Sequence, residues 1–222
     1  MRRRNFLKGA AAFCFSLAAF PARGAELKSE TVSSPAMIID LERCMGCESC
    51  VVACGLRHNG AAGVFPTSVD IMEIGRYPDT RIFSFPRLCN QCDDADCIKA
   101  CPSGAAFRRA DGIVVTDAGL CNGCGSCVAA CPFGARQADP SQGMKVVKCD
   151  FCLDRTGSGR GLPVCVEMCP AHARIFGDIN SPSGEFASYL VEKRLFQLSM
   201  RKGTGGRVFY AGERRLAEMV EL

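Results

Sequence analysis

Sixteen of the seventeen cysteines fall into four runs of four, and each run ends in the pattern Cys-x3-Cys. The runs are Cys44, Cys47, Cys50 and Cys54; Cys89, Cys92, Cys97 and Cys101; Cys121, Cys124, Cys127 and Cys131; and Cys149, Cys152, Cys165 and Cys169. Proline directly follows the last cysteine of three runs, at Pro102, Pro132 and Pro170. Thiolate sulfur is a soft ligand that suits iron, and the run C-x2-C-x2-C-x3-C-P is typical of cubane iron–sulfur sites. The sixteen thiolates therefore predict four [4Fe–4S] clusters and a chain that carries electrons.

The spacing within a run explains how it would hold such a cluster. Two residues between cysteines let one loop reach three corners of a cube, and the fourth cysteine lies a helical turn further on. In two-cluster ferredoxins that fourth cysteine ligates the other cluster. Spacing alone leaves the pairing of the runs open. Adjacent runs could pair, first with second and third with fourth, or the pairing could be nested, first with fourth and second with third.

Zinc and disulfide bonds are the alternative uses of paired cysteines. Zinc ribbons present isolated Cys-x2-Cys pairs and often include histidine. Here each such pair is followed by a Cys-x3-Cys pair, with proline behind it in three of the four runs. A disulfide within a Cys-x2-Cys pair would close a strained small loop. The two histidines, His58 and His172, are expected to be solvated surface residues, and Lys99, Arg108 and Arg109 are candidates to raise cluster potentials. No nucleophile, acid–base pair or open metal site is found, which predicts no catalytic residues.

One structural unit recurs around each run: a short apolar strand, the cysteine loop, a helical turn and an exit of small residues. The expected strands lie in residues 37–43, 82–85, 113–120 and 145–148, and the expected helical turns in 50–54, 97–101, 127–131 and 165–169. This repeat predicts an α+β fold of two ferredoxin-like (bacterial dicluster) modules with loop insertions and a C-terminal extension.

Two longer stretches lie outside the repeat. Residues 55–81 contain several glycines and prolines and are expected to form a surface excursion. Residues 173–222 form the extension, which is expected to pack over the cluster region or against a partner. Helical periodicity is predicted there at Phe186, Tyr189, Leu190, Leu195, Phe196 and Leu198.

The first 24 residues have the features of an export signal. The segment Arg3-Arg4-Asn5-Phe6-Leu7-Lys8 resembles the twin-arginine motif R-R-x-F-L-K, and the apolar stretch 9–20 is too short to span a bilayer. Cleavage is expected after Gly24, with Ala25 as the alternative, followed by a polar linker at residues 25–35. The twin-arginine route carries folded cargo, so clusters are expected to be loaded before export to the periplasm. The seventeenth cysteine, Cys14, lies inside this leader.

The excess of positive charge in the chain lies in that leader. The whole chain has 27 Lys and Arg against 23 Asp and Glu, and five of the basic residues lie in residues 1–24. The remainder therefore has 22 basic and 23 acidic side chains, a net charge of −1. Nothing in this balance predicts binding to nucleic acid or to an anionic membrane surface.

Several segments between residues 36 and 212 resemble the four-cluster electron-transfer subunits of dimethyl-sulfoxide-reductase-type molybdoenzymes. They are residues 39–47 (IDLERCMGC), 88–93 (LCNQCD), 148–152 (KCDFC) and 162–170 (LPVCVEMCP). Residues 173–179 (ARIFGDI) and 208–210 (VFY) are similar to those of tetrathionate- and polysulfide-reductase members in particular.

The resemblance implies the nested pairing and four ligand sets. They are Cys44, Cys47, Cys50 and Cys169 for cluster 1; Cys54, Cys149, Cys152 and Cys165 for cluster 2; Cys89, Cys92, Cys97 and Cys131 for cluster 3; and Cys101, Cys121, Cys124 and Cys127 for cluster 4. It also divides the tandem region 36–172 into an outer module (36–88 and 140–172) and an inner module (89–139).

The same resemblance implies partners for the chain. It implies a molybdopterin catalytic subunit and an integral membrane subunit that reacts with quinol, so that the chain reaches the membrane only through a partner. The expected function is electron relay to a respiratory acceptor, with a tetrathionate-like sulfur oxyanion favoured. The alternatives are a freestanding periplasmic polyferredoxin, or the iron–sulfur subunit of a nitrite-reductase or hydrogenase system.

Overall fold

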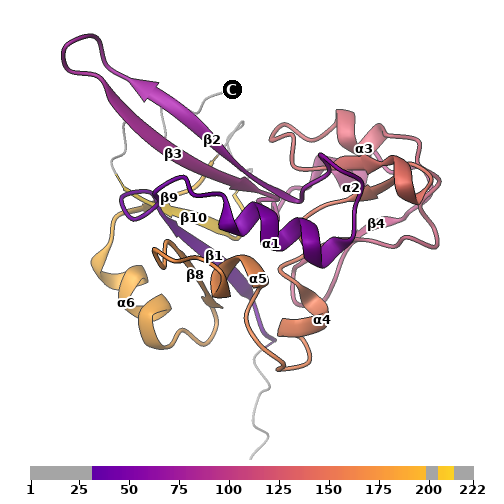
Figure 1. Ribbon diagram of the computed structural model, residues 1–222. Helices are drawn as coiled ribbons and strands as arrows, with labels where there is room; N and C mark the ends of the chain where they lie inside the picture. The colour runs from indigo at the N-terminus through magenta and orange to yellow at the C-terminus, as the bar shows by residue number, and fades with distance from the viewer. Residues whose placement is uncertain (1–31, 199–204, 213–222) are drawn as a thin grey trace, which may run out of the picture. The chain divides into compact units, whose positions relative to one another are not determined.

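The computed structural model of this chain describes residues 32–198 and 205–212; the leader and most of the linker lie outside these ranges. The helices are α1 (Ser49–His58), α2 (Asp96–Lys99), α3 (Ser126–Ala129), α4 (Leu153–Thr156), α5 (Val164–Glu167) and α6 (Gly184–Glu192). The strands are β1 (Pro35–Asp40), β2 (Thr67–Ile74), β3 (Arg81–Leu88), β4 (Ala106–Arg108), β5 (Val114–Thr116), β6 (Gln137–Asp139), β7 (Lys145–Val147), β8 (Arg174–Asp178), β9 (Leu195–Phe196) and β10 (Val208–Ala211). The fold is therefore a mixture of short helices and small sheets, as the sequence predicts (Figure 1).

The largest sheet of the described residues has the strand order β8-β1-β10-β9. Strand β1 is antiparallel to β8 and parallel to β10, with Met37 opposite Phe176 and Val208. Side chains alternate between the two faces of a strand, and both faces of β1 are buried. Met37 and Ile39 belong to the core that contains several cysteines, while Ile38 packs on the other face with residues of α6. The sheet thus separates the cysteine-rich core from α6.

Helix α6 is fixed to this sheet by a buried hydrogen bond. The hydroxyl of Tyr189 donates to Oδ2 of Asp40 over 2.7 Å, and Oδ1 of Asp40 accepts from the backbone N–H groups of Glu42 and Arg43. Asp40 therefore ties the C-terminal extension to the end of β1, at the entrance to the first cysteine loop. The expectation that part of the extension packs on the body of the fold is confirmed for α6.

The helical turns that follow the cysteine loops differ in length for a local reason. Helices α2, α3 and α5 each span four residues, and a proline follows the last cysteine of their runs, where it cannot continue a helix. The first run has Gly55 at this position, and α1 continues to His58 before Asn59 ends it in the left-handed region. The four predicted turns are confirmed, but the first is the start of a longer helix.

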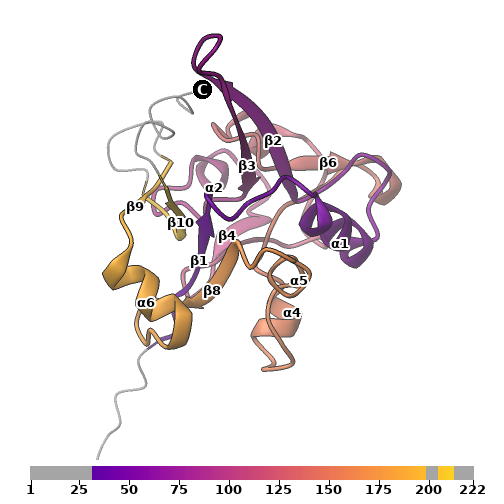
Figure 2. The same ribbon diagram turned by 60° about the vertical axis from the view of Figure 1, so that its left-hand side comes forward.

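The predicted surface excursion at residues 55–81 is more regular than expected. Its first residues belong to α1, and β2 pairs with β3 in an antiparallel hairpin, from Thr67 opposite Leu88 to Ile74 opposite Arg81. In both views the hairpin extends away from the sheet that contains β1 (Figures 1 and 2). Strand β2 matters for the site described below because it brings Thr67 to the buried core.

The helical periodicity predicted at the C-terminal end is correct only in part. Phe186, Tyr189 and Leu190 lie in α6, but Leu195 and Phe196 form β9, opposite Ala211 and Tyr210 of β10. The helix ends at Glu192, and the backbone of Lys193, which follows, is extended. Pairing with β10 satisfies backbone groups of β9, and so the prediction of a helix over residues 195–198 is wrong.

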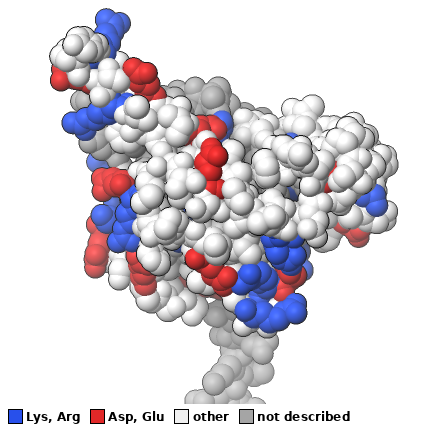
Figure 3. Space-filling view, in the orientation of Figure 1, with Lys and Arg blue, Asp and Glu red and all other residues white. Residues whose placement is uncertain are grey.

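The remaining strands form two small antiparallel pairs, β4 with β5 and β6 with β7. Strands β1, β3, β5 and β7 lie where the sequence predicts a strand before each cysteine run. On the face drawn in Figure 3, acidic and basic side chains are interspersed over the described residues. This mixture agrees with the nearly balanced charge that remains once the leader is set aside.

Candidate functional site

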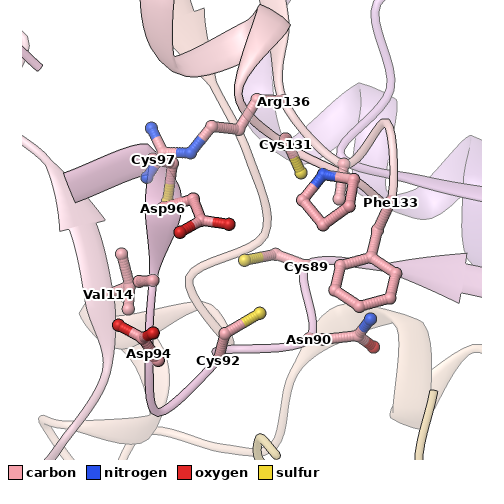
Figure 4. A pocket seen from close by; sticks show the side chains of 13 residues that line it. Cys89, Asn90, Cys92, Asp94, Asp96, Cys97, Val114, Cys131, Phe133 and Arg136 are labelled. Carbon is pink, nitrogen blue, oxygen red and sulfur yellow. The ribbon is translucent and has the colours of Figure 1, made fainter. Parts of the chain in front are cut away.

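One pocket is lined by cysteines from two different runs. Cys89 and Cys92 come from the loop after β3, Cys97 from α2, and Cys131 from the end of the turn that contains α3. The Sγ atoms of Cys89, Cys92 and Cys131 point into this pocket (Figure 4). Helices α2 and α3 contact each other, which brings the last cysteine of the third run to the first three of the second.

A second pocket repeats this arrangement with the other two runs. It is lined by Cys44, Cys47 and Cys50 of the first run and by Cys169 of the fourth. Helices α1 and α5 contact each other here, and Pro86 of β3 closes part of the wall. The fourth cysteine of the fourth run therefore lies beside the first three of the first run.

Electrostatic interactions link six of the remaining eight cysteines to members of the same group. The thiols of Cys54, Cys149, Cys152 and Cys165 interact electrostatically with one another, Cys54 coming from α1 and the other three from the fourth run. The thiols of Cys101 and Cys124 interact in the same way, again joining the end of one run to the loop of another. All sixteen cysteines of the described residues are free thiols.

The pKa values of these thiols indicate what kind of group they could bind. Burial raises the pKa of the Cys92 and Cys54 thiols to about 12, and it raises the pKa of Cys149 well above its usual value. Neighbouring cysteines add to each rise. Metal ligation requires the thiolate, so the bound group must bring enough positive charge to offset this cost. A group of several iron ions has that charge.

The placement of the thiols fits a polynuclear group. A single zinc ion needs its cysteine ligands about 2.3 Å from one point. Within the described ranges, no three His, Cys, Asp or Glu side chains converge as the ligands of one ion do. The thiols stand instead around pockets, four from two runs in each of the two cases above. This donor set fits [4Fe–4S] clusters held by cysteine.

Several thiols also form hydrogen bonds with the small residues that follow them. Cys47 and Cys124 are exposed, and each shares a hydrogen bond of 3.4 Å with the hydroxyl two residues on, Ser49 or Ser126. This bond is the main cause of the lowered pKa of both thiols. The backbone N–H groups of Ala106 and Ala173 donate to the sulfurs of Cys101 and Cys169 over 3.4 and 3.3 Å. Such bonds stabilise negative charge on sulfur.

Gln91 joins the loop of the second run to the fourth run. Its side chain is fully buried, its Nε2 donates to the carbonyl of Cys149 over 2.8 Å, and its Oε1 accepts from the backbone N–H of Val114 over 2.8 Å. Both ends of this amide therefore fix the relative position of cysteine loops. The segment 88–93 contains Gln91, but its role as a link between runs follows only from the structure.

The cations suggested by the sequence as potential-raising groups are not the ones that lie against the thiols. Lys99 is exposed and pairs with Asp94, and Arg109 pairs with Asp111. Arg108 donates to the backbone carbonyls of Cys92 and Asp93. Of the two histidines, His172 is exposed as expected, but His58 is half-buried, and burial lowers its pKa. His58 is therefore less solvated than expected.

The sequence-based prediction of site residues did not include two buried arginines. Arg136 and Arg174 are 2% and 3% exposed, and each lines one of the two pockets. Both follow the last cysteine of a run in the pattern Cys-Pro-x-x-Ala-Arg, at residues 131–136 and 169–174. This repeated pattern is a signal that the sequence contains, and extending the predicted small-residue exits by one position would have included it.

Comparison with known proteins identifies relatives of this chain. A family model described as a 4Fe-4S dicluster domain matches residues 80–179. The chain is 42% identical to a subunit of tetrathionate reductase from Salmonella typhimurium over 181 residues, which cover 80% of this chain and 72% of the relative. It is 36% identical to a subunit of sulfite dehydrogenase from Allochromatium vinosum over 191 residues, 76% of this chain and 79% of the relative.

Another relative aligns along almost its whole length. Protein NrfC of Escherichia coli is 33% identical over 213 residues, 93% of this chain and 93% of the relative.

Among the helices that the structure describes, none has the length and apolar character needed to cross a membrane.

Proposed function

Because the chain belongs to the family of iron–sulfur electron-transfer subunits of molybdoenzyme-type reductases, we propose that it relays electrons through four [4Fe–4S] clusters. The relay would connect a membrane subunit that oxidises quinol with a molybdopterin catalytic subunit. The chain has iron–sulfur cofactors and no proposed catalytic residue of its own. The observation that carries the proposal is the convergence of four cysteines from two runs on one pocket, seen twice.

The ligand sets follow the nested pairing. We assign Cys44, Cys47, Cys50 and Cys169 to cluster 1, and Cys89, Cys92, Cys97 and Cys131 to cluster 3, which the pockets support. Cys54, Cys149, Cys152 and Cys165 form the set for cluster 2, which their thiol–thiol interactions support. Cys101, Cys121, Cys124 and Cys127 form the set for cluster 4, which is supported by the interaction between Cys101 and Cys124. When bound, each cluster supplies a centre that gains and loses one electron at a time.

The protein around these sites has two tasks in a relay. It keeps successive sites close together, as the interaction of Cys165 in set 2 with Cys50 in set 1 indicates. It also leaves the sites accessible to partners, since Cys47 in set 1 and Cys124 in set 4 are exposed. Two ferredoxin-like modules, residues 36–88 with 140–172 and residues 89–139, are the organisation that this pairing implies.

The proposed partners and acceptor come from the relatives. These include subunits of tetrathionate reductase and of sulfite dehydrogenase, and a dimethyl sulfoxide reductase iron–sulfur subunit. A catalytic partner is therefore part of the proposal, with a tetrathionate-like sulfur oxyanion as the favoured acceptor. A second candidate is a role like that of Protein NrfC, which is favoured by an alignment over 93% of both chains.

The proposed location is the periplasm, with the membrane reached only through a partner subunit. The twin-arginine segment Arg3-Arg4-Asn5-Phe6-Leu7-Lys8 supports export of a folded, cluster-loaded protein. This segment lies outside the described residues.

The proposal predicts which proteins accompany the chain. Affinity purification of the tagged chain from anaerobically grown cells should yield a large molybdenum-containing subunit and a multi-span membrane protein in equal amounts with it. Metal analysis and mass spectrometry of the eluate measure this. A lone holoprotein that reduces and oxidises reversibly would contradict the complex and would favour the freestanding polyferredoxin.

A further inference from the structure

Arg136 and Arg174 are buried charges that line the two cysteine pockets. Burying a cation is costly unless a negative group or hydrogen bonds compensate for the lost water. Lys148 is also buried, but its Nζ donates to the carbonyl of Cys149 over 2.7 Å. The two arginines instead face the thiols, so their charge has a different partner.

Arg136 is anchored by Thr116 and directs the rest of its guanidinium toward the pocket of Cys89, Cys92, Cys97 and Cys131. Its Nη1 donates to Oγ1 of Thr116 over 3.0 Å, while Nε and Nη2 are buried without a hydrogen-bond partner among the described residues. Figure 4 shows the guanidinium beside Cys97 at the wall of the pocket. Among neighbouring groups, the thiols of Cys97, Cys89 and Cys127 have the strongest electrostatic interactions with this charge.

Arg174 repeats the arrangement in the other half of the cysteine runs. Its Nη2 donates to Oγ1 of Thr67 over 2.9 Å, and Nη1 is buried without a hydrogen-bond partner in the part of the chain that the structure describes. Among neighbouring groups, the thiols of Cys165, Cys50 and Cys149 have the strongest electrostatic interactions with its charge. A threonine hydroxyl thus anchors each guanidinium, and cysteines surround the remainder.

Each arginine faces thiols from two different ligand sets. Cys97 and Cys89 belong to set 3 and Cys127 to set 4, whereas Cys165 and Cys149 belong to set 2 and Cys50 to set 1. In both pairs of sites, then, one positive charge is shared by two neighbouring cluster sites. This position is where a fixed charge would act on both members of a pair at once.

We propose that Arg136 and Arg174 raise the reduction potentials of the two cluster sites with whose cysteines each one interacts. This inference rests on the proposed function and its ligand sets. One-electron reduction adds a negative charge to a site and neither forms nor breaks a bond to it. A nearby cation in a poorly solvated interior stabilises that added charge, and net charge and hydrogen bonds near the sulfurs are known to set such potentials. The arginines would keep each pair of sites reducible by the same donor.

The test compares Arg136→Gln and Arg174→Gln with the wild-type holoprotein in redox titrations followed by electron paramagnetic resonance. Dithionite supplies the electrons. In Arg136→Gln the ratio of reduced to oxidised clusters 3 and 4 at a fixed potential should fall at least about tenfold, a shift of about 59 mV for one electron. In Arg174→Gln clusters 1 and 2 should shift instead. Arg76→Gln removes the same charge from an exposed turn, where water screens it, and should shift none.

Iron content separates the possible failures. A Gln variant that keeps its iron but has wild-type potentials overturns the inference and leaves the proposed function intact. Wild-type protein without iron and reducible signals overturns the proposed function itself. If a Gln variant loses its clusters, the matching Lys variant decides. If the Lys variant has its clusters and wild-type potentials, the role of the positive charge is supported. If the Lys variant also loses its clusters, or if its potentials fall as far as those expected for the Gln variant, that role is contradicted.

Discussion

Replacing Cys131 with serine should remove the cluster held by Cys89, Cys92 and Cys97, not a cluster held by the rest of its own run. Cys131 lines the pocket formed by those three cysteines, and the contact between α2 and α3 holds it there. The expected loss is about one quarter of the iron, since one of four cubane sites loses a ligand. Iron analysis and electron paramagnetic resonance of the anaerobically purified variant measure the loss.

The comparison variants decide between the two pairings. Under the nested pairing, the signal lost in Cys131→Ser is the one lost in Cys92→Ser. Under the adjacent pairing, it is the one lost in Cys149→Ser. Cys14→Ser is the matched control, because Cys14 lies in the leader outside every run, and its iron content should equal that of the wild type. If Cys131→Ser and Cys149→Ser remove the same signal, the proposed ligand sets are refuted.

Changing the twin arginines should stop export completely. In Arg3→Lys/Arg4→Lys the charge of the leader is kept, but the arginine pair that defines the twin-arginine signal is lost. The cluster-loaded protein should then accumulate in the cytoplasm, and the periplasmic amount should fall to background. Fractionation followed by immunoblotting and visible absorption measures both. Arg2→Lys, adjacent to the pair, should be exported normally, and undiminished periplasmic protein in the double variant would disprove the export route.

The local parts of the fold were predictable because each depends on a short stretch of sequence. The apolar run before Cys44 becomes β1, and the run before Cys121 contains β5. The turns after the cysteine loops were predictable for the same reason, since proline limits how far a helix can extend. Only the first run, with Gly55 in place of proline, departs from this rule by forming the longer α1.

Pairing over long distances in the sequence was not predictable in the same way. Leu195 and Phe196 form a short apolar run that periodicity cannot assign to helix or strand. Their structure is decided by Tyr210 and Ala211 of β10, which itself depends on parallel pairing with β1. Such register is a property of the assembled sheet.

The burial of the two arginines at the site was also not predictable, because it depends on residues far away in the sequence. The repeated Cys-Pro-x-x-Ala-Arg pattern is visible in the sequence, but an arginine is usually exposed. Burial of Arg174 depends on Thr67 from β2, which lies far from it in the sequence. The composition of residues 55–81 predicts a surface excursion where this hairpin forms, and so the sequence offers no reason to place a hydroxyl beside the guanidinium.

The central claim is that the sixteen cysteines hold four cubane clusters, and metal analysis of the exported protein tests it most directly. Anaerobically purified protein should contain about sixteen iron atoms and about sixteen acid-labile sulfides per chain, with paramagnetic signals that appear on reduction. Protein that contains a few zinc ions per chain, no labile sulfide and no reducible signal would contradict the account.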